Sequence, residues 1–341
     1  MGTPRWASVA LFLAILFVAL APLSVLAGGP PVEPPGLEQA IAAQEAHTDA
    51  LLGRAGVVGT AVGVGADGQA VVKIYTSAAH VTGLPHRLDS APVEVEVTGE
   101  FVAQSIGESS GTERLIISGG QLYCTTGTLG ALVTPVNGTL GALSNAHVYA
   151  GQGSTTNGTV QVGQNGDWIL QPGRVDMTDQ ACGSPQEIDN AVIGRLWQYV
   201  PIKFSRKANN TVDAAIAWLT GPKGVDNTTP PDGYGTPSST PAPAVLNLAV
   251  QKYGRTTGLT KGTVTGVNAT VFVRYDKGVT RFVKQVITSA LSGGGDSGSL
   301  IVTQAGNHPV ALLFAGSSSS TIGNPIDLVL GAFGVTIDGG P

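Results

Sequence analysis

Glycine and proline interrupt this chain so often that long regular elements have little room to form. The 341 residues include 48 Gly and 21 Pro, with many Val and Thr between them. Glycine and proline favour turns, and β-branched residues favour strands, so this pattern is typical of short strands joined by tight turns. The sequence therefore predicts a mostly β protein with few helices, and its length allows two domains or three small ones.

The charge of the chain excludes one class of partner. Charged residues make up only 12% of the sequence, and the formal net charge is −5. A nucleic-acid-binding protein needs a basic surface, so we expect no nucleic-acid partner. No Cys or His residues stand at the spacing of a metal site, so we also expect no metal and no cofactor.

The N-terminus resembles an export signal. Arg5 is followed by the apolar run "ALFLAILFVALAPLSVL" (residues 10–26), and the small residue Ala27 ends a segment suited to cleavage. An uncleaved membrane anchor is the alternative, but the run is near the lower limit for a spanning helix and contains Pro22. We therefore expect a signal peptide over residues 1–27 and a secreted protein, outside the cell or in its envelope, with no stable membrane span.

The two cysteines, Cys124 and Cys182, are expected to form a disulfide, because an exported chain meets an oxidising environment. Such a bridge would stabilise the fold by roughly 4 kcal/mol in the chain-entropy model. Two buried free thiols are the alternative.

Residues 28–117 are predicted to form a small α/β module that is accessory to the rest, or a pro-segment. Residues 37–53 have helix-forming composition, and two β runs meet at the hairpin signal Asp67-Gly68. The alternating "PVEVEVTG" follows, and then the polar tether "SIGESSGTER" (residues 105–114). We expect this module to modulate the rest of the chain without supplying residues to its chemistry; a role in folding alone is the alternative.

Residues 118–341 consist of short β runs separated by Gly turns, which predicts a second, all-β region. The Pro- and Gly-rich stretch 227–244 interrupts it and is either a long surface loop or a link between two sub-domains. We favour the link, which leaves about residues 118–226 for one small barrel and about residues 245–338 for another.

The stretch "SGGGDSGSLIV" (residues 292–302) is the strongest candidate for chemistry. Its glycines stop at Ser299 and an apolar run begins at once, which argues against a flexible linker. Glycines also allow backbone N–H groups to point into one small space, as in an oxyanion hole. Ser297 is therefore a candidate nucleophile, and a Gly-rich hairpin loop is the alternative.

A serine nucleophile needs a base and a carboxylate that orients it. His147 follows an apolar strand at the mouth of a turn, whereas the other histidines lie in the N-terminal module or in a polar turn. Asp213 stands where a polar loop becomes an apolar strand, and Asp189 is a rival with similar surroundings. The remaining candidates in this region lie in a polar segment and are expected to be solvated: Asp176 and Asp179.

The order His147, Asp213, Ser297, within "SNAHV", "VDAAIAWL" and "GDSGSLIV", resembles the chymotrypsin-like serine peptidases, and most closely their secreted bacterial branch. Similar blocks such as "GTLGALV", "LQPG" and "KYGRTTGLTKGTVTG" extend the resemblance over about residues 118–338. It implies two six-stranded β-barrels with the triad in the cleft between them. It also implies that Asp213 is the acid and that the backbone N–H groups of Gly295 and Ser297 form the oxyanion hole.

The resemblance departs from the family pattern in one respect that bears on activation. In activated trypsin-like enzymes the acid that matches Asp296 pairs with a freshly cut N-terminus, but no "IVGG"-type start precedes the first barrel. The predicted function is a secreted serine endopeptidase acting on protein or peptide substrates. An exported binding or adhesion module with a peptidase-like shell is the alternative from another class.

The substrate pocket is predicted from the resemblance. By resemblance, Leu291 contributes to the substrate pocket, and the backbone of Phe314, Ala315 and Gly316 binds the substrate strand. Because Leu291 carries no charge for Lys or Arg, we expect a small or apolar residue before the scissile bond. The sequence does not indicate an oligomeric state.

Overall fold

The computed structural model describes residue 2 and residues 33–104, 112–118, 121–135, 140–154, 159–173, 189–220 and 224–341. Nearly all of the predicted signal peptide, Asp176, Asp179, Cys182 and most of the tether 105–114 lie outside these residues. The disulfide between Cys124 and Cys182 therefore stays a prediction. Within the described part of the chain, no helix has both the length and the apolar composition of a membrane span.

Strands dominate the described residues, which confirms the predicted mostly β fold class. The helical elements are short apart from the first: α1 (Leu37–Leu52), α2 (Ala146–Tyr149), a 3-10 turn at Gly163–Asn165 and α4 (Ile326–Phe333).

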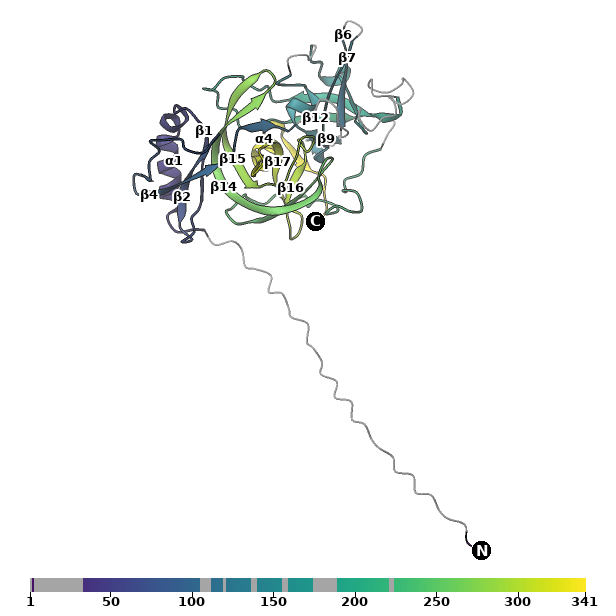
Figure 1. Cartoon of the computed structure of the whole chain (residues 1–341). Coiled ribbons are helices and arrows are strands. Elements are labelled where there is room, and N and C mark those ends of the chain that lie inside the picture. Colours follow the sequence, from purple (N-terminus) through teal and green to yellow (C-terminus); the bar gives the residue numbers. More distant parts are fainter. Residues whose placement is uncertain are drawn as a thin grey trace. The chain divides into compact units, whose positions relative to one another are not determined.

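A closed six-stranded β-barrel forms within the predicted second barrel. In order of pairing its strands are β13 (Ala249–Gly254), β14 (Gly258–Tyr275), β15 (Gly278–Ser289), β18 (Ser320–Pro325), β17 (Pro309–Gly316) and β16 (Leu300–Thr303). All neighbours are antiparallel, and the ring closes because β13 pairs with both β14 and β16. The long curved hairpin of β14 and β15 is the green pair of strands in Figure 1.

Seven strands between Thr112 and Leu219, together with the chain's last strand, form an eight-stranded sheet, called the first sheet below. In order of pairing its strands are β19 (Val335–Ile337), β8 (Ala131–Pro135), β9 (Gly141–Ser144), β12 (Ala215–Leu219), β11 (Val192–Tyr199), β10 (Trp168–Leu170), β6 (Thr112–Ser118) and β7 (Gln121–Gly127). Among the described residues β7 and β19 do not pair with each other, so this sheet does not close as the second barrel does. The chain's last strand, β19, therefore returns to the first sheet, which the sequence did not predict.

The N-terminal region continues the sheet of the second barrel. The helix forms where predicted and packs on β1 (Val57–Val64), β2 (Ala70–Thr76) and β4 (Ala91–Val97), with the short β3 (Arg87–Leu88) at the edge (Figure 1). β1 pairs antiparallel with β14, so these strands and the barrel share one ladder of backbone hydrogen bonds. The last strand, β5 (Phe101–Ala103), pairs with both β14 and β17.

Apolar packing fixes the two sheets and the N-terminal region against one another. One buried cluster joins Leu143 of the first sheet to Leu300 and Leu312 of the second barrel. Another joins Phe101 of β5 to Phe282 and Phe314. Full burial of one such side chain stabilises a fold by about 1.5–3 kcal/mol, so these clusters hold the segments around the site in place.

Candidate active site

His147 and Asp213 are brought together by two elements of the first sheet. His147 lies in α2, just after β9, and Asp213 lies just before β12, with 3% and 0% of their surfaces exposed. The imidazole Nδ1 is 2.5 Å from Asp213 Oδ2, and the backbone N–H of His147 donates to Oδ1 at 3.0 Å. A carboxylate only accepts hydrogen bonds, so Nδ1 is the donor in this pair. Nε2 has no hydrogen-bond partner in the described part of the chain, so the structure pairs His147 with Asp213 but does not pair it with the Ser297 hydroxyl.

Asp189, the other candidate for the acid, is not the residue that contacts His147. Asp189 lies in a short helical turn and is exposed to solvent. The structure therefore brings Asp213, and not Asp189, to the imidazole of His147.

Three side chains hold Asp213 in place. The backbone N–H of Asp213 donates to Asn324 Oδ1 at 2.9 Å, and Asn145 Nδ2 donates to the backbone carbonyl of Asp213 at 2.7 Å. The Tyr275 hydroxyl donates to Asp213 Oδ2 at 2.9 Å. Since Asn324 and Tyr275 belong to β18 and β14, the second barrel orients the acid that the first sheet provides.

Tyr275 is a positioning residue that the sequence reasoning missed. Its ring packs edge-on against His147, with ring centroids 5.7 Å apart. Burial, and then the charge of Asp213 and the hydrogen bond to it, hold the pKa of the Tyr275 hydroxyl well above its usual value. The phenol therefore stays protonated and donates to the carboxylate. Nothing in "VFVRYDKG" marks this tyrosine, because its partner is far away in the sequence.

Ser297 lies in a turn that only glycine can complete. Gly298 has a φ of +97°, and a Cβ there would lie 2.1 Å from the carbonyl oxygen of Thr128. Thr128 in turn donates its backbone N–H to the carbonyl of Ser297 at 2.7 Å and its hydroxyl to the carbonyl of Gly295 at 2.9 Å. Thr128 follows β7, so this contact ties the serine turn to the first sheet, which carries His147.

The Ser297 hydroxyl is buried and donates to the carbonyl oxygen of Phe314 at 3.1 Å. The backbone N–H groups of Gly295 and Ser297 point at one acceptor, the carbonyl oxygen of Gln104, at 2.7 and 3.4 Å. Two N–H donors that converge on one carbonyl oxygen beside a serine are what an oxyanion hole requires.

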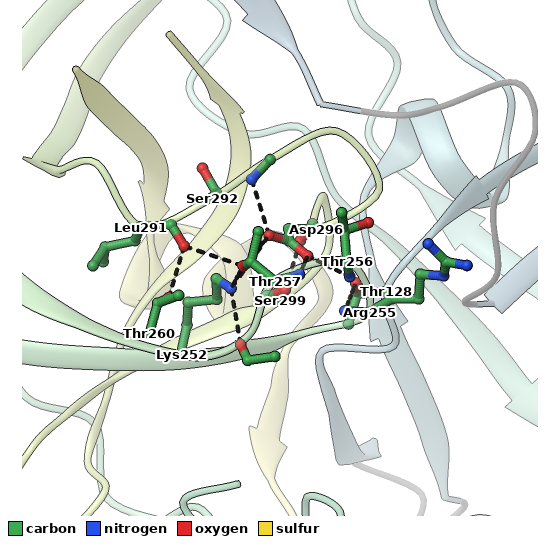
Figure 2. Close-up of polar contacts among 12 residues, drawn as sticks. Thr128, Lys252, Arg255, Thr256, Thr257, Thr260, Leu291, Ser292, Asp296 and Ser299 are labelled. Atoms are coloured by element: carbon green, nitrogen blue, oxygen red, sulfur yellow. Dashed lines mark hydrogen bonds and ion pairs between the residues drawn. The ribbon is translucent and has the colours of Figure 1, made fainter. Parts of the chain in front are cut away.

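Hydrogen bonds to the buried carboxylate of Asp296 hold the turn around Ser297 in place (Figure 2). Its carboxylate is fully buried and accepts the backbone N–H groups of Gly293, Thr256 and Thr257, at 3.0, 2.8 and 3.2 Å. The Thr257 hydroxyl donates to it at 2.6 Å, and Lys252 Nζ lies 3.2 Å away. With so many donors on one carboxylate, the backbone between Gly293 and Ser297 has little freedom to move.

Lys252 supplies the positive charge that faces Asp296. It is fully buried in β13, and its ammonium also donates to the Thr257 hydroxyl and to the carbonyl of Gly258. Burial lowers the pKa of Lys252, and the charge of Asp296 and the hydrogen bond to it act against that shift. The acid next to the nucleophile thus has a cation within the chain, where the family resemblance suggested a freshly cut N-terminus. The sequence contained a signal for this buried lysine. Lys252 stands two residues from Val250, so both side chains lie on the same face of a buried strand.

The predicted pocket residues divide into two groups. Phe314, Ala315 and Gly316 lie in β17 and present their backbone to β5. Leu291 is 2% exposed and packs into the apolar core of the second barrel, while its carbonyl accepts the Thr260 hydroxyl at 2.7 Å (Figure 2). Within the described residues, no three His, Cys, Asp or Glu side chains gather as a metal site would require.

Comparison with known proteins gives sequence relatives for part of the chain. No protein-family model matches it. It is 38% identical over 102 residues to glutamyl endopeptidase 2 of Streptomyces griseus, a match covering 29% of this chain and 52% of that protein. It is 37% identical over 99 residues to serine protease 1 of Streptomyces fradiae, covering 28% of this chain and 27% of that protein. The chain thus matches about half the length of the first relative and about a quarter of the second.

Solved structures give a weak likeness over more of the chain. A glutamic acid specific serine protease matches with a TM-score of 0.42 and 25% identity, over 66% of this chain and 97% of its own. Nocardiopsis protease matches with a TM-score of 0.44 and 20% identity, over 68% of this chain and 97% of its own.

The structure thus holds two parts that a serine peptidase site needs, the buried pair of His147 with Asp213 and a turn at Ser297 with two converging N–H groups. Over the parts of the chain that they match, the two sequence relatives are peptidases by name.

Replacing Lys252 with Met should destabilise the protein, because it leaves the Asp296 carboxylate buried without its cation. Breaking a buried ion pair in this way costs about 3–5 kcal/mol. Lys261→Met, which makes the same change at an exposed position of β14, is the matched control and should cost far less. Urea unfolding of both variants measures the difference, and equal stability of the two would contradict this role for Lys252.

Tyr275→Phe should slow the reaction of Ser297 with a fluorophosphonate about tenfold to a hundredfold, because a hydrogen bond to a charged group is lost. The carboxylate, with one donor fewer, should hold the imidazolium more strongly, so the acidic limb of the pH–rate profile should move to higher pH.

The control is Tyr253→Phe, which removes a 3.0 Å hydrogen bond to the exposed Asp232. It should change neither the rate nor the profile. A Tyr275→Phe variant that merely melts earlier, with an unshifted profile, would reduce Tyr275 to a packing role.

Proposed function

We propose that the protein is a secreted serine endopeptidase that cleaves peptide bonds through an acyl-enzyme on Ser297. The observation that carries the proposal is the convergence of the Gly295 and Ser297 N–H groups on one carbonyl oxygen. The second support is the buried imidazole of His147, which is held by Asp213. A binding module would have no use for either feature.

In the first half of the reaction, the Ser297 oxygen attacks the substrate carbonyl carbon while its proton passes to His147 Nε2. Asp213 accepts the hydrogen bond from Nδ1, so it stabilises the imidazolium that forms. The negative charge that develops on the substrate oxygen is met by the two backbone N–H groups. His147 then donates its proton to the leaving amine, and the C–N bond breaks.

In the second half, water attacks the ester on Ser297 in the same geometry, and His147 accepts its proton and returns it to the serine oxygen. Asn324 and Tyr275 keep Asp213 in place throughout, and their role needs no motion of the barrels. No step requires a metal or a cofactor.

Several finer features belong to the proposal. The export signal over residues 1–27 supports secretion, and the disulfide between Cys124 and Cys182 suits an oxidising environment. We further propose that the N-terminal region up to about residue 117 modulates the catalytic region. Its strand β5 lies against β17, whose backbone we assign to substrate binding, which supports this role.

Ser297→Ala should abolish covalent labelling by a fluorophosphonate, because it removes the only atom to which the reagent would bond. Labelling is followed to its endpoint by mass spectrometry, and circular dichroism should show that the variant keeps its fold. Labelling of the variant to the extent of the wild type would remove Ser297 from the mechanism. A folded wild-type protein that never labels would favour the binding-module alternative.

Asp213→Asn should lower turnover by about 10⁴, because the amide leaves His147 in the wrong tautomer. Asp189→Asn makes the same substitution at an exposed position and should leave turnover unchanged. The labelling rate of the two variants measures this difference. The reverse order of the two effects would transfer the role of the acid to Asp189.

A further inference from the structure

Two buried amide side chains of the second barrel, called the amide relay below, connect β15 to Asp213. Gln285 of β15 and Asn324 of β18 are both fully buried, and Asn324 Nδ2 donates to Gln285 Oε1 at 2.6 Å. Asn324 Oδ1 accepts the backbone N–H of Asp213 at 2.9 Å. At the other end, Gln285 Nε2 donates to the backbone carbonyls of Thr211 and Val283, at 2.9 and 2.5 Å. The relay therefore ends on backbone groups at both sides.

These backbone groups fix the direction of the amide relay. A carbonyl only accepts hydrogen bonds, so the NH₂ group of Gln285 faces Thr211 and its oxygen faces Asn324. A backbone N–H only donates, so the oxygen of Asn324 faces Asp213 and its NH₂ group faces Gln285. The two assignments agree where the amides meet. If either amide turned over, like groups would face each other at both of its contacts.

A bulge in β15 sets the direction of the Gln285 side chain. Between the pairings of Gln285 and Phe282 with β14, β14 advances two residues and β15 advances three. Lys284 lies in this extra length and has a φ of +61°, which a residue with a side chain rarely adopts. The extra residue also explains why Phe282 and Ile287 share one buried cluster although they are an odd number of positions apart. Bulges often re-aim a side chain next to an active site, and strained backbone points to a role for what it positions.

The segment that the relay contacts is the one that carries Asp213. Its start is paired with β15, because the backbone N–H of Val283 donates to the carbonyl of Asn210 at 2.9 Å. Both carboxylate oxygens of Asp213 contact His147, one through the backbone N–H and one through Nδ1. A small rotation of this segment would therefore move the carboxylate away from the imidazole.

We infer, on the basis of the proposed peptidase function, that Gln285 is a positioning residue for the reaction of Ser297. Gln285 touches no reacting group and acts through Asn324, whose amide oxygen it keeps facing the backbone N–H of Asp213. It thereby holds the carboxylate in the place from which it orients the imidazole of His147. Because every donor and acceptor along the relay has a partner, the buried segment is held in one arrangement.

The surroundings of Gln285 make it suited to truncation. Gln285 borders an open groove on the second barrel, whose lining also includes Pro243, Lys284 and Pro325. In Gln285→Ala, water can enter the space of the amide and bond to the polar groups around it, so we expect the variant to fold. Water donates or accepts equally well, so it does not impose a direction on the amide of Asn324.

Gln285→Ala should slow the initial fluorophosphonate labelling of Ser297 about fivefold to tenfold, the effect of one lost hydrogen bond. The matched control is Gln251→Ala in β13. Gln251 is 6% exposed, and its amide bonds to another asparagine, Asn307, at 3.0 Å. This control should be labelled like the wild type. Circular dichroism and urea unfolding show whether each variant is folded and how stable it is.

Proton NMR reports on the pair of His147 with Asp213 itself. The Nδ1 proton lies in a 2.5 Å hydrogen bond to the carboxylate, and a proton in so short a bond resonates far downfield. In Gln285→Ala this resonance should move upfield or broaden, whereas in Gln251→Ala it should keep its wild-type position. A role of Gln285 in stability alone would leave the resonance of the folded variant unchanged.

A double-variant cycle tests whether Gln285 acts through Asn324. Asn324→Ala removes the acceptor for the backbone N–H of Asp213 and should slow labelling at least as much as Gln285→Ala. Adding Gln285→Ala to Asn324→Ala should then slow labelling no further, because the relay is already interrupted. If the two effects multiply in the double variant, Gln285 does not act through Asn324 and the inference is wrong.

The labelling experiment also separates this inference from the proposed function. A wild-type chain that is labelled at Ser297, with Gln285→Ala labelled at the same rate, overturns the inference and leaves the peptidase proposal standing. A folded wild-type chain that is never labelled contradicts the proposed function itself. If Gln285→Ala does not fold, Gln285→Met, which keeps the volume of the side chain, takes its place in all three measurements, with Gln251→Met as its control.

Discussion

The shape of the candidate active site depends on one buried ion pair, that of Asp296 with Lys252. Two charges removed from water are stable only when hydrogen bonds and the opposite charge replace their solvation. Here the carboxylate has that support from three backbone N–H groups, a threonine hydroxyl and the ammonium 3.2 Å away. The same backbone carries the N–H groups of Gly295 and Ser297, so satisfying Asp296 also fixes the oxyanion hole. Because the cation comes from β13, this shape does not depend on a cut in the chain.

The second requirement is that the first sheet and the second barrel are held against each other where the candidate base and nucleophile lie. His147 and Asp213 come from the first sheet and Ser297 from the second barrel. Thr128 ties the serine turn to the first sheet, and Asn324 ties Asp213 to the second barrel. These contacts are short, buried and specific, so they set the relative position of base and nucleophile more tightly than apolar packing alone. The N-terminal strands then add to the outer edge of β14, and β5 reaches the site from there.

The sequence could predict what is local. Gly and Pro spacing indicated short strands, and the surroundings of His147, Asp213 and Ser297 indicated their chemistry, with the family resemblance deciding between Asp213 and Asp189. The sequence could not predict contacts between residues that lie far apart in the chain. Tyr275 and Asp213 are one such pair, and Gln104 and Gly295 are another. A strand's periodicity reports which face is buried and not which edge it will pair with, so the addition of β1 to β14 and the return of β19 to β8 had no local signal. Lys252 is the exception, because a lysine on the buried face of a strand is costly unless a group of opposite charge lies next to it.

The most direct test of the account is the reactivity of Ser297 in Lys252→Met, measured as its rate of fluorophosphonate labelling at a temperature where circular dichroism shows the variant folded. If the ion pair of Asp296 with Lys252 fixes the backbone N–H groups around Ser297, this variant should be labelled about tenfold more slowly or worse. Lys261→Met should be labelled like the wild type. Equal labelling rates of the two folded variants would contradict the claim that this ion pair shapes the site.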